Sequence, residues 1–136
     1  IASAHELLNQ DKRTGEYPCL GYIIEGNGVK IYHAGDTCIY PELYKKLREN
    51  SHFSAIFLPI NGRDAKRLEN NIIGNMTYQE ATDLAGYIEP DLVVPGHYEM
   101  FPGNSENPEL FTSYLRVKYP HLKAWVGEHG ERVILT

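Results

Sequence analysis

The sequence predicts an α/β domain (α+β in some schemes), a mixed sheet with helices packed on one outer face. A hairpin signal, Gly26-Asn27-Gly28, joins two apolar segments in the first part of the chain. Segments with helical and strand periodicity then alternate towards the end. No repeat, low-complexity tract or linker interrupts the 136 residues. We therefore expect residues 1–136 to form a single unit.

The first half of the chain is expected to contain three strands and one helix. Residues 20–25 and 29–33 read as the two strands of the hairpin. Residues 41–49 read as a short helix, because a proline opens the segment and two leucines four residues apart share one face. The apolar segment 54–59 predicts a strand buried on both sides. A polar loop rich in glycine and asparagine follows over residues 61–75.

The second predicted helix begins after Thr77. Thr77 and Glu80 form a capping box, in which each side chain satisfies a backbone N–H of the other residue. Pro90 ends this helix, and a strand follows over residues 91–95. The spacing i, i+3, i+4, i+7 gives the helix one apolar face, made of Ala81, Leu84, Ala85 and Ile88.

A third helix is expected to start at Asn107, with Pro108 at the first helical position. Its inward residues are predicted to be Leu110, Phe111, Tyr114 and Leu115. Two last strands, residues 124–127 and 132–135, are expected to be joined by a turn over residues 128–131.

Three residues with metal-ligating side chains lie at expected strand ends, far apart in the sequence. Asp36 follows the strand 29–33 after a glycine that permits a sharp turn. His97 follows the apolar run 92–95, and His5 lies in Ser-Ala-His-Glu at the start of the chain. Because the strands of one sheet bring their ends to one edge, we expect Asp36, His97 and His5 to approach a common point.

The neighbours of Asp36 have alternative interpretations. His33 is expected to cap its strand or to orient Asp36 through a hydrogen bond, with Thr37 in a similar supporting position. Cys38 is conceivable as a thiolate ligand, but a small buried hydrophobic residue is the simpler interpretation. A lone histidine is usually a surface or core residue, so His5 and His97 gain their interest from the motifs around them.

Taken in order, these motifs resemble the last three metal-ligand motifs of the metallo-β-lactamase superfamily. The matching elements are His5, the block His-Ala-Gly-Asp-Thr that ends at Thr37, and Pro-Gly-His ending at His97. Two further blocks resemble the L-ascorbate-6-phosphate lactonase-like branch. They are Phe-Leu-Pro-Ile-Asn-Gly-Arg-Asp at residues 57–64 and Gly-Asn-Met-Thr-Tyr-Gln-Glu-Ala at residues 74–81.

The resemblance implies the C-terminal half of a four-layer αββα sandwich. The family's first metal motif, His-x-His-x-Asp-His, belongs to the N-terminal half, and no His-x-His occurs in this sequence. By analogy, His5 completes the shell of one metal, His97 completes that of a second, and Asp36 bridges the two. The chain alone is then expected to bind metal weakly or not at all. It begins at Ile1, which fits either a piece of a longer protein or a processed chain.

The resemblance also implies a partner and an activity. The partner is the missing N-terminal half, and the sheet face that meets it should be apolar, which also favours a homo-oligomer. The activity is that of a metal-dependent hydrolase with two zinc or manganese ions. It is most specifically a lactonase that opens a phosphorylated sugar-acid lactone with a hydroxide generated at the metals. Asp36 and His97 would be catalytic. The alternative is a non-catalytic module that keeps the fold for binding or assembly.

Three further residues are candidates for contact with an anionic small-molecule substrate. Arg63 could hold a phosphate through two hydrogen bonds, with Asp64 beside it, or the two could form a surface pair. Tyr98, directly after His97, is expected to line the pocket.

Composition excludes several other classes of protein. A formal net charge of -5 argues against a nucleic-acid or anionic-membrane surface, but it permits an anionic small substrate beside a metal. No apolar run approaches the roughly 20 residues that cross a bilayer. Two cysteines are too few for a disulfide framework, and we therefore expect a cytoplasmic protein.

Overall fold

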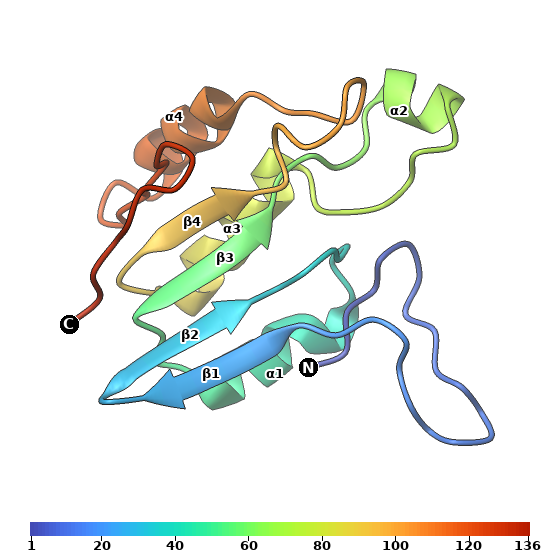
Figure 1. Ribbon diagram of the computed structural model, residues 1–136, viewed down its shortest axis with the longest axis horizontal. Helices are drawn as coiled ribbons and strands as arrows, with labels where there is room; N and C mark the ends of the chain where they lie inside the picture. Colours follow the sequence, from blue (N-terminus) through green and yellow to red (C-terminus); the bar gives the residue numbers. More distant parts are fainter.

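The computed structural model describes residues 1–136 and has a four-stranded mixed sheet of order β1-β2-β3-β4 (Figure 1). β1 (Tyr22–Gly26) and β2 (Val29–His33) form an antiparallel hairpin. β3 (Ala55–Pro59) and β4 (Val93–Gly96) continue the sheet, each parallel to its predecessor. Both residues of the hairpin turn, Asn27-Gly28, have positive φ, the backbone that suits the twist of the flanking strands. The expected α/β fold is confirmed.

Four helices accompany the sheet. α1 (Pro41–Asn50), α3 (Tyr78–Ile88) and α4 (Pro108–Lys118) lie close to their predicted bounds. α3 contacts β3, α1 and α4, and in Figure 1 α1 and α3 lie behind the strands. The capping box at Thr77 is present in both directions, which confirms the predicted start of α3. The fourth helix, α2 (Ala65–Glu69), interrupts the stretch that was predicted to be a loop throughout.

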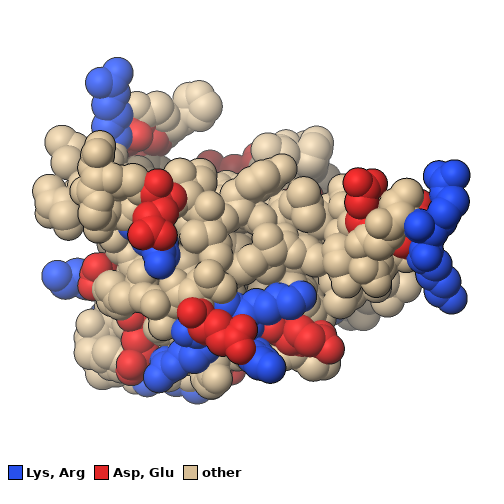
Figure 2. Space-filling model, turned by 90° about the horizontal axis from the view of Figure 1, so that it is seen from below, with Lys and Arg blue, Asp and Glu red and all other residues tan.

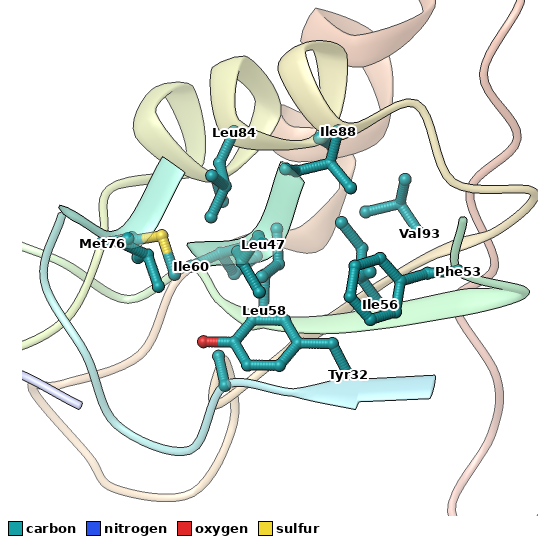
Figure 3. Packing of buried hydrophobic residues seen from close by; sticks show 14 of the residues in the cluster. Tyr32, Leu47, Phe53, Ile56, Leu58, Ile60, Met76, Leu84, Ile88 and Val93 are labelled. Carbon is teal, nitrogen blue, oxygen red and sulfur yellow. The ribbon is translucent and has the colours of Figure 1, made fainter. Parts of the chain in front are cut away.

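The core lies between α1, α3, α4 and one face of the sheet. Tyr32, Ile56 and Leu58 point from the strands towards the helices and are fully buried. Figure 3 shows Leu84 and Ile88 of α3 packed above this face. A single apolar layer therefore holds the parallel strands in place, and their carboxyl ends reach the same edge.

The opposite sheet face carries apolar side chains that remain exposed. Strand register pairs Tyr22 with His33, Ile24 with Ile31, and His33 with Phe57, so these five side chains share one face. Tyr22 and Ile24 are more than half exposed, and Ile31 and Phe57 are partly exposed. This is the face that the resemblance assigned to the missing half.

The predictions for the last part of the chain need two corrections. Leu110 was predicted to point inward, but it is 41% exposed, because Phe111 and Leu115 of the same helix already fill the contact with the core. The prediction of two final strands is also wrong. The segment 124–127 makes a single parallel bridge, from Ala124 to Val93, and the segment 132–135 finds no strand partner for its backbone.

Charged side chains of both signs are intermixed on the surface seen in Figure 2. Elsewhere in the chain as well as in this view, charges can pair; the structure has ion pairs between Lys30 and Glu25 and between Lys45 and Glu49. Opposite charges this close largely cancel each other's field, so the surface in this view has no patch of one sign. None of the helices combines the length and the apolar character that a membrane span requires.

Candidate functional site

The carboxyl ends of β2, β3 and β4 meet at one edge of the sheet, and two predicted ligands lie within three residues of these ends. Asp36 comes after β2, in a turn where Gly35 has a φ of 62°. His97 follows β4 and has a φ of 57°, a left-handed backbone that is uncommon for a residue with a Cβ. Such a conformation costs of order 1–3 kcal/mol and is concentrated at functional positions.

The N-terminal segment brings His5 to the same edge. The backbone N–H of Ala4 donates to Oγ1 of Thr37 at 2.9 Å, and the N–H of Cys38 donates to the carbonyl of Ala4 at 2.7 Å. These two bonds fasten the residue before His5 to the two residues after Asp36. Thr37 therefore supports the site from a buried position, by fixing the backbone that carries His5.

The two histidines flank the carboxylate of Asp36 from different sides. His5 Nε2 lies 3.7 Å from Asp36 Oδ2, and His97 Nε2 lies 3.5 Å from Asp36 Oδ1. These distances are long for hydrogen bonds. They are close to the roughly 3.4 Å that separates two ligands, each about 2.1 Å from one tetrahedral ion. The spacing of each histidine and the nearer carboxylate oxygen is therefore suitable for two ligands of one divalent ion.

The chain itself does not complete a metal shell. No group of three His, Cys, Asp or Glu side chains in it is arranged to hold a metal ion. The structure brings Asp36, His97 and His5 together. Asp36 and His97 follow strands, as predicted, but His5 does not, because the N-terminal segment makes only an isolated bridge from Ala2 to Leu20. Their role as metal ligands stays a prediction.

His33 and Cys38 support the turn around Asp36. His33 stacks on Phe57, and its Nδ1 accepts a hydrogen bond of 3.1 Å from the backbone N–H of Gly35. It holds the turn and makes no hydrogen bond with the Asp36 carboxylate. The Cys38 thiol is buried beside three backbone carbonyls, including that of His5 at 3.6 Å. Burial raises the pKa of this thiol, which favours the neutral packed group over a thiolate ligand.

Arg63 has its partners inside the protein. Its guanidinium donates to Glu80 at 2.6 Å, to the backbone carbonyl of Asn75 at 2.9 Å and to Cys38 Sγ at 3.1 Å. Asp64 accepts from the N–H of Arg67 and caps α2. Neither Arg63 nor Asp64 lines the cavities at Asp36, so the geometry favours structural roles for both.

Three cavities open around His97. One of about 260 Å³ lies over the sheet edge, between His33, Phe57 and Asp36. A second, also of about 260 Å³, has His5, Asp36 and His97 on one side and residues from the 71–75 and 101–104 segments on the other. Tyr98 lines a third cavity, which it shares with His97 and the C-terminal residues 125–131. Burial also raises the pKa of Tyr98, so its hydroxyl stays protonated.

A polar cluster that the sequence did not predict lies beside the second cavity. Asn61, Asn75 and Asn104 form a chain of side-chain hydrogen bonds, and the buried side chain of Arg67 lies next to it. The only signal in the sequence was the high asparagine content of the 61–75 segment. Asn75 Oδ1 and His97 Nδ1 are buried and have no hydrogen-bond partner in the chain. An unpaired buried polar atom of this kind costs about 1–3 kcal/mol, so both atoms call for an explanation.

This chain is similar to several proteins that are named metal-dependent hydrolases. The family model described as beta-lactamase superfamily domain matches residues 1–98. A protein from Thermococcus onnurineus named UPF0173 metal-dependent hydrolase is 32% identical over 115 residues, which make up 85% of this chain and 42% of that protein. A protein of the same name from Desulfitobacterium hafniense is 29% identical over 85% of this chain and 44% of its own length.

Solved structures agree with the sequence matches. Igni18, a metallo hydrolase from the archaeon Ignicoccus hospitalis, superposes with a TM-score of 0.71 and 27% identity. The match covers 96% of this chain and 49% of Igni18. A Thermotoga maritima protein of the metallo-beta-lactamase superfamily has a TM-score of 0.52 and 20% identity, a likeness of fold alone. The chain thus spans about half the length of the proteins it matches.

Proposed function

The chain belongs to the metallo-β-lactamase superfamily, and we propose that it is the C-terminal half of a metal-dependent hydrolase. The observation that carries the proposal is the Asp36 carboxylate, which presents one oxygen to His5 and the other to His97. The names of the relatives from Thermococcus and Desulfitobacterium, both metal-dependent hydrolases, support the same reaction class.

His5, Asp36 and His97 would hold divalent ions, two of them in the complete site, zinc or manganese. A bound divalent ion lowers the pKa of a coordinated water and polarises the carbonyl under attack. The residues of this chain prepare that chemistry. Asp36 places its carboxylate between two imidazoles, and the hydrogen bonds of Ala4 with Thr37 and Cys38 fix the backbone next to His5 against it. Asp36 and His5 stay substantially exposed, which leaves the carboxylate open to further ligands and to substrate.

The remaining ligands would come from an N-terminal half of the same fold. Two observations support this partner: the exposed apolar sheet face around Ile24, and the fact that the chain covers 42–44% of its relatives' length. If that face stays uncovered, it favours a homo-oligomer. Free thiols at Cys19 and Cys38 support a cytoplasmic location.

The substrate that we propose is a phosphorylated sugar-acid lactone. The support is the resemblance of residues 57–64 and 74–81 to the L-ascorbate-6-phosphate lactonase-like branch. Arg63 as the phosphate contact stays a prediction, and its three internal partners argue for a structural role instead.

The test uses the full-length protein, with both halves present. We expect about two divalent ions per molecule by elemental analysis and hydrolysis of a lactone panel that includes phosphorylated sugar lactones. Asp36→Asn keeps the shape but removes the charge, so metal content and turnover should both fall by at least tenfold. His121→Gln is the control, because His121 is an exposed histidine whose contacts are with Glu89 and the ring of Tyr119, away from Asp36. A metal-free, inactive wild-type protein would favour the non-catalytic module.

A further inference from the structure

The outward face of α4 carries two exposed apolar side chains, on the side of the molecule away from the β1–β2 hairpin (Figure 1). Leu110 is 41% exposed and Val117 is 81% exposed. They are two helical turns apart, so they share one face of the helix. Phe111 and Leu115 point from the other face into the core. Because α4 packs on the helix side of the sheet, an N-terminal half on the open side of the sheet does not cover Leu110 and Val117.

A small residue lies between the two apolar side chains. Ser113 is about one turn from both Leu110 and Val117, and its Oγ donates to the carbonyl of Leu110 at 3.2 Å. Burial of this hydroxyl against a neighbouring helix therefore leaves no hydrogen bond unmade. A small side chain at this position also lets a second helix approach closely, with the apolar residues on either side of the crossing point.

One flank of this face carries two charges that have no partner in the chain. Glu109 lies in the first turn of α4 and Arg116 in the last, and both are exposed. They are two turns apart, as Leu110 and Val117 are, and so lie on the same flank. Lys118, by contrast, is paired with Asp83 of α3. The free charges of α4 therefore lie beside its exposed apolar residues, with the acid at one end and the base at the other.

This face is complementary to a second copy of itself in antiparallel orientation. A two-fold axis through Ser113 places Leu110 of one copy beside Val117 of the other. One flank of a helix meets the same flank of an antiparallel copy, so Glu109 of each copy lies beside Arg116 of the other, and every contact occurs twice. The helix macrodipoles are then also opposed, which is favourable. A parallel pair would instead bring Glu109 against Glu109 and Arg116 against Arg116, where like charges repel.

We propose that the outward face of α4 is a self-association surface, through which two copies of the protein form an antiparallel helix pair. The dimer does not require the open sheet face, and it does not depend on the hydrolase function. The contact is small, because α4 has 11 residues and is about 16 Å long. It buries less than the roughly 1,200–2,000 Å² of a standard stable interface, so the dimer dissociates in the micromolar range.

Sedimentation velocity of the full-length protein, from about 1 to about 200 µM, measures the dissociation constant of the dimer. Arg116→Glu and Glu109→Arg each bring like charges together at two places, so each should raise this constant by about tenfold. The double variant, with both changes, restores opposite charges across the contact and should return the constant to within about threefold of the wild-type value. Lys45→Glu is the matched control, because it reverses an exposed helical charge on α1 and should leave the constant unchanged.

The double variant separates a lost contact from a damaged helix, because it carries both changes to α4. Val117→Asp gives a second test at a position that is exposed in the single chain. It should raise the dissociation constant at least tenfold and leave the unfolding temperature of the dilute, monomeric protein unchanged. A wild-type protein that stays monomeric at every concentration would overturn the proposal. A dimer that resists the single changes, or that the double variant fails to restore, would overturn it as well.

Discussion

If the open sheet face is covered by an N-terminal half, Ile24→Ala should destabilise the isolated chain and the full-length protein by different amounts. Ile24 is 55% exposed in this chain, so a little under half of its surface is removed from water. Complete burial of an isoleucine side chain is worth about 1.5–3 kcal/mol, so the isolated chain should lose roughly 1 kcal/mol. In the full-length protein the same position would be core, where the substitution costs about 2–5 kcal/mol.

Urea denaturation of both proteins measures the two values. Ile23→Ala is the matched control, because Ile23 is the preceding residue of β1 and packs against the core on the helix side. Its cost should be the same in the isolated chain and in the full-length protein. A loss of stability for Ile24→Ala that is no larger in the full-length protein would show that nothing covers this face.

Three further predictions concern buried polar groups. Burial raises the pKa of Tyr40 to about 12, above its value of about 10 in the unfolded chain, so the unfolded state releases the proton first. The contribution of Tyr40 to the free energy of unfolding should therefore be fully present below pH ~10 and should decrease between pH ~10 and 12. Denaturation midpoints measured across this pH range test this, and a midpoint that does not change with pH would contradict it. Tyr32→Phe should raise the free energy of unfolding by about 1 kcal/mol, because the buried hydroxyl of Tyr32 has no hydrogen-bond partner. Thermal unfolding measures the change, and a variant less stable than the wild type would refute the prediction. Arg67→Met should lower the free energy of unfolding by about 3–5 kcal/mol, because Glu106 and two backbone carbonyls lose their buried hydrogen-bond donor. Urea denaturation measures this, and a decrease below about 1 kcal/mol would show that the arginine is dispensable.

The elements that the sequence predicted well have local causes. The hairpin depends on Asn27-Gly28, two residues that accept positive φ with little strain. The start of α3 depends on Thr77 and Glu80, which bond each other's backbone within a single turn. In both cases the residues that decide the structure lie within four positions of each other, so the sequence pattern alone carries the information.

The elements that it predicted wrongly depend on distant partners. The segment 132–135 has strand composition, but a strand forms only where a neighbouring strand offers a ladder, and the chain provides none there. α2 is only five residues long, and its capping residue Asp64 is held by the buried Arg67. Neither fact can be read from periodicity over so short a segment.

The residues of the candidate site also differ in whether their positions have a local cause or depend on distant partners. Asp36 and His97 could be predicted because each directly follows a parallel strand, and the topology then fixes where both must lie. The position of His5 needs the bonds from Ala4 and Cys38, which link residues more than thirty positions apart. The asparagine chain joins residues 14 and 43 positions apart, on three separate segments. Each amide alone looks like an ordinary loop residue, because its hydrogen-bond partners come from distant segments. Candidate ligands can thus be predicted from strand ends, whereas a buried polar cluster becomes visible only when the hydrogen bonds of the folded chain are known.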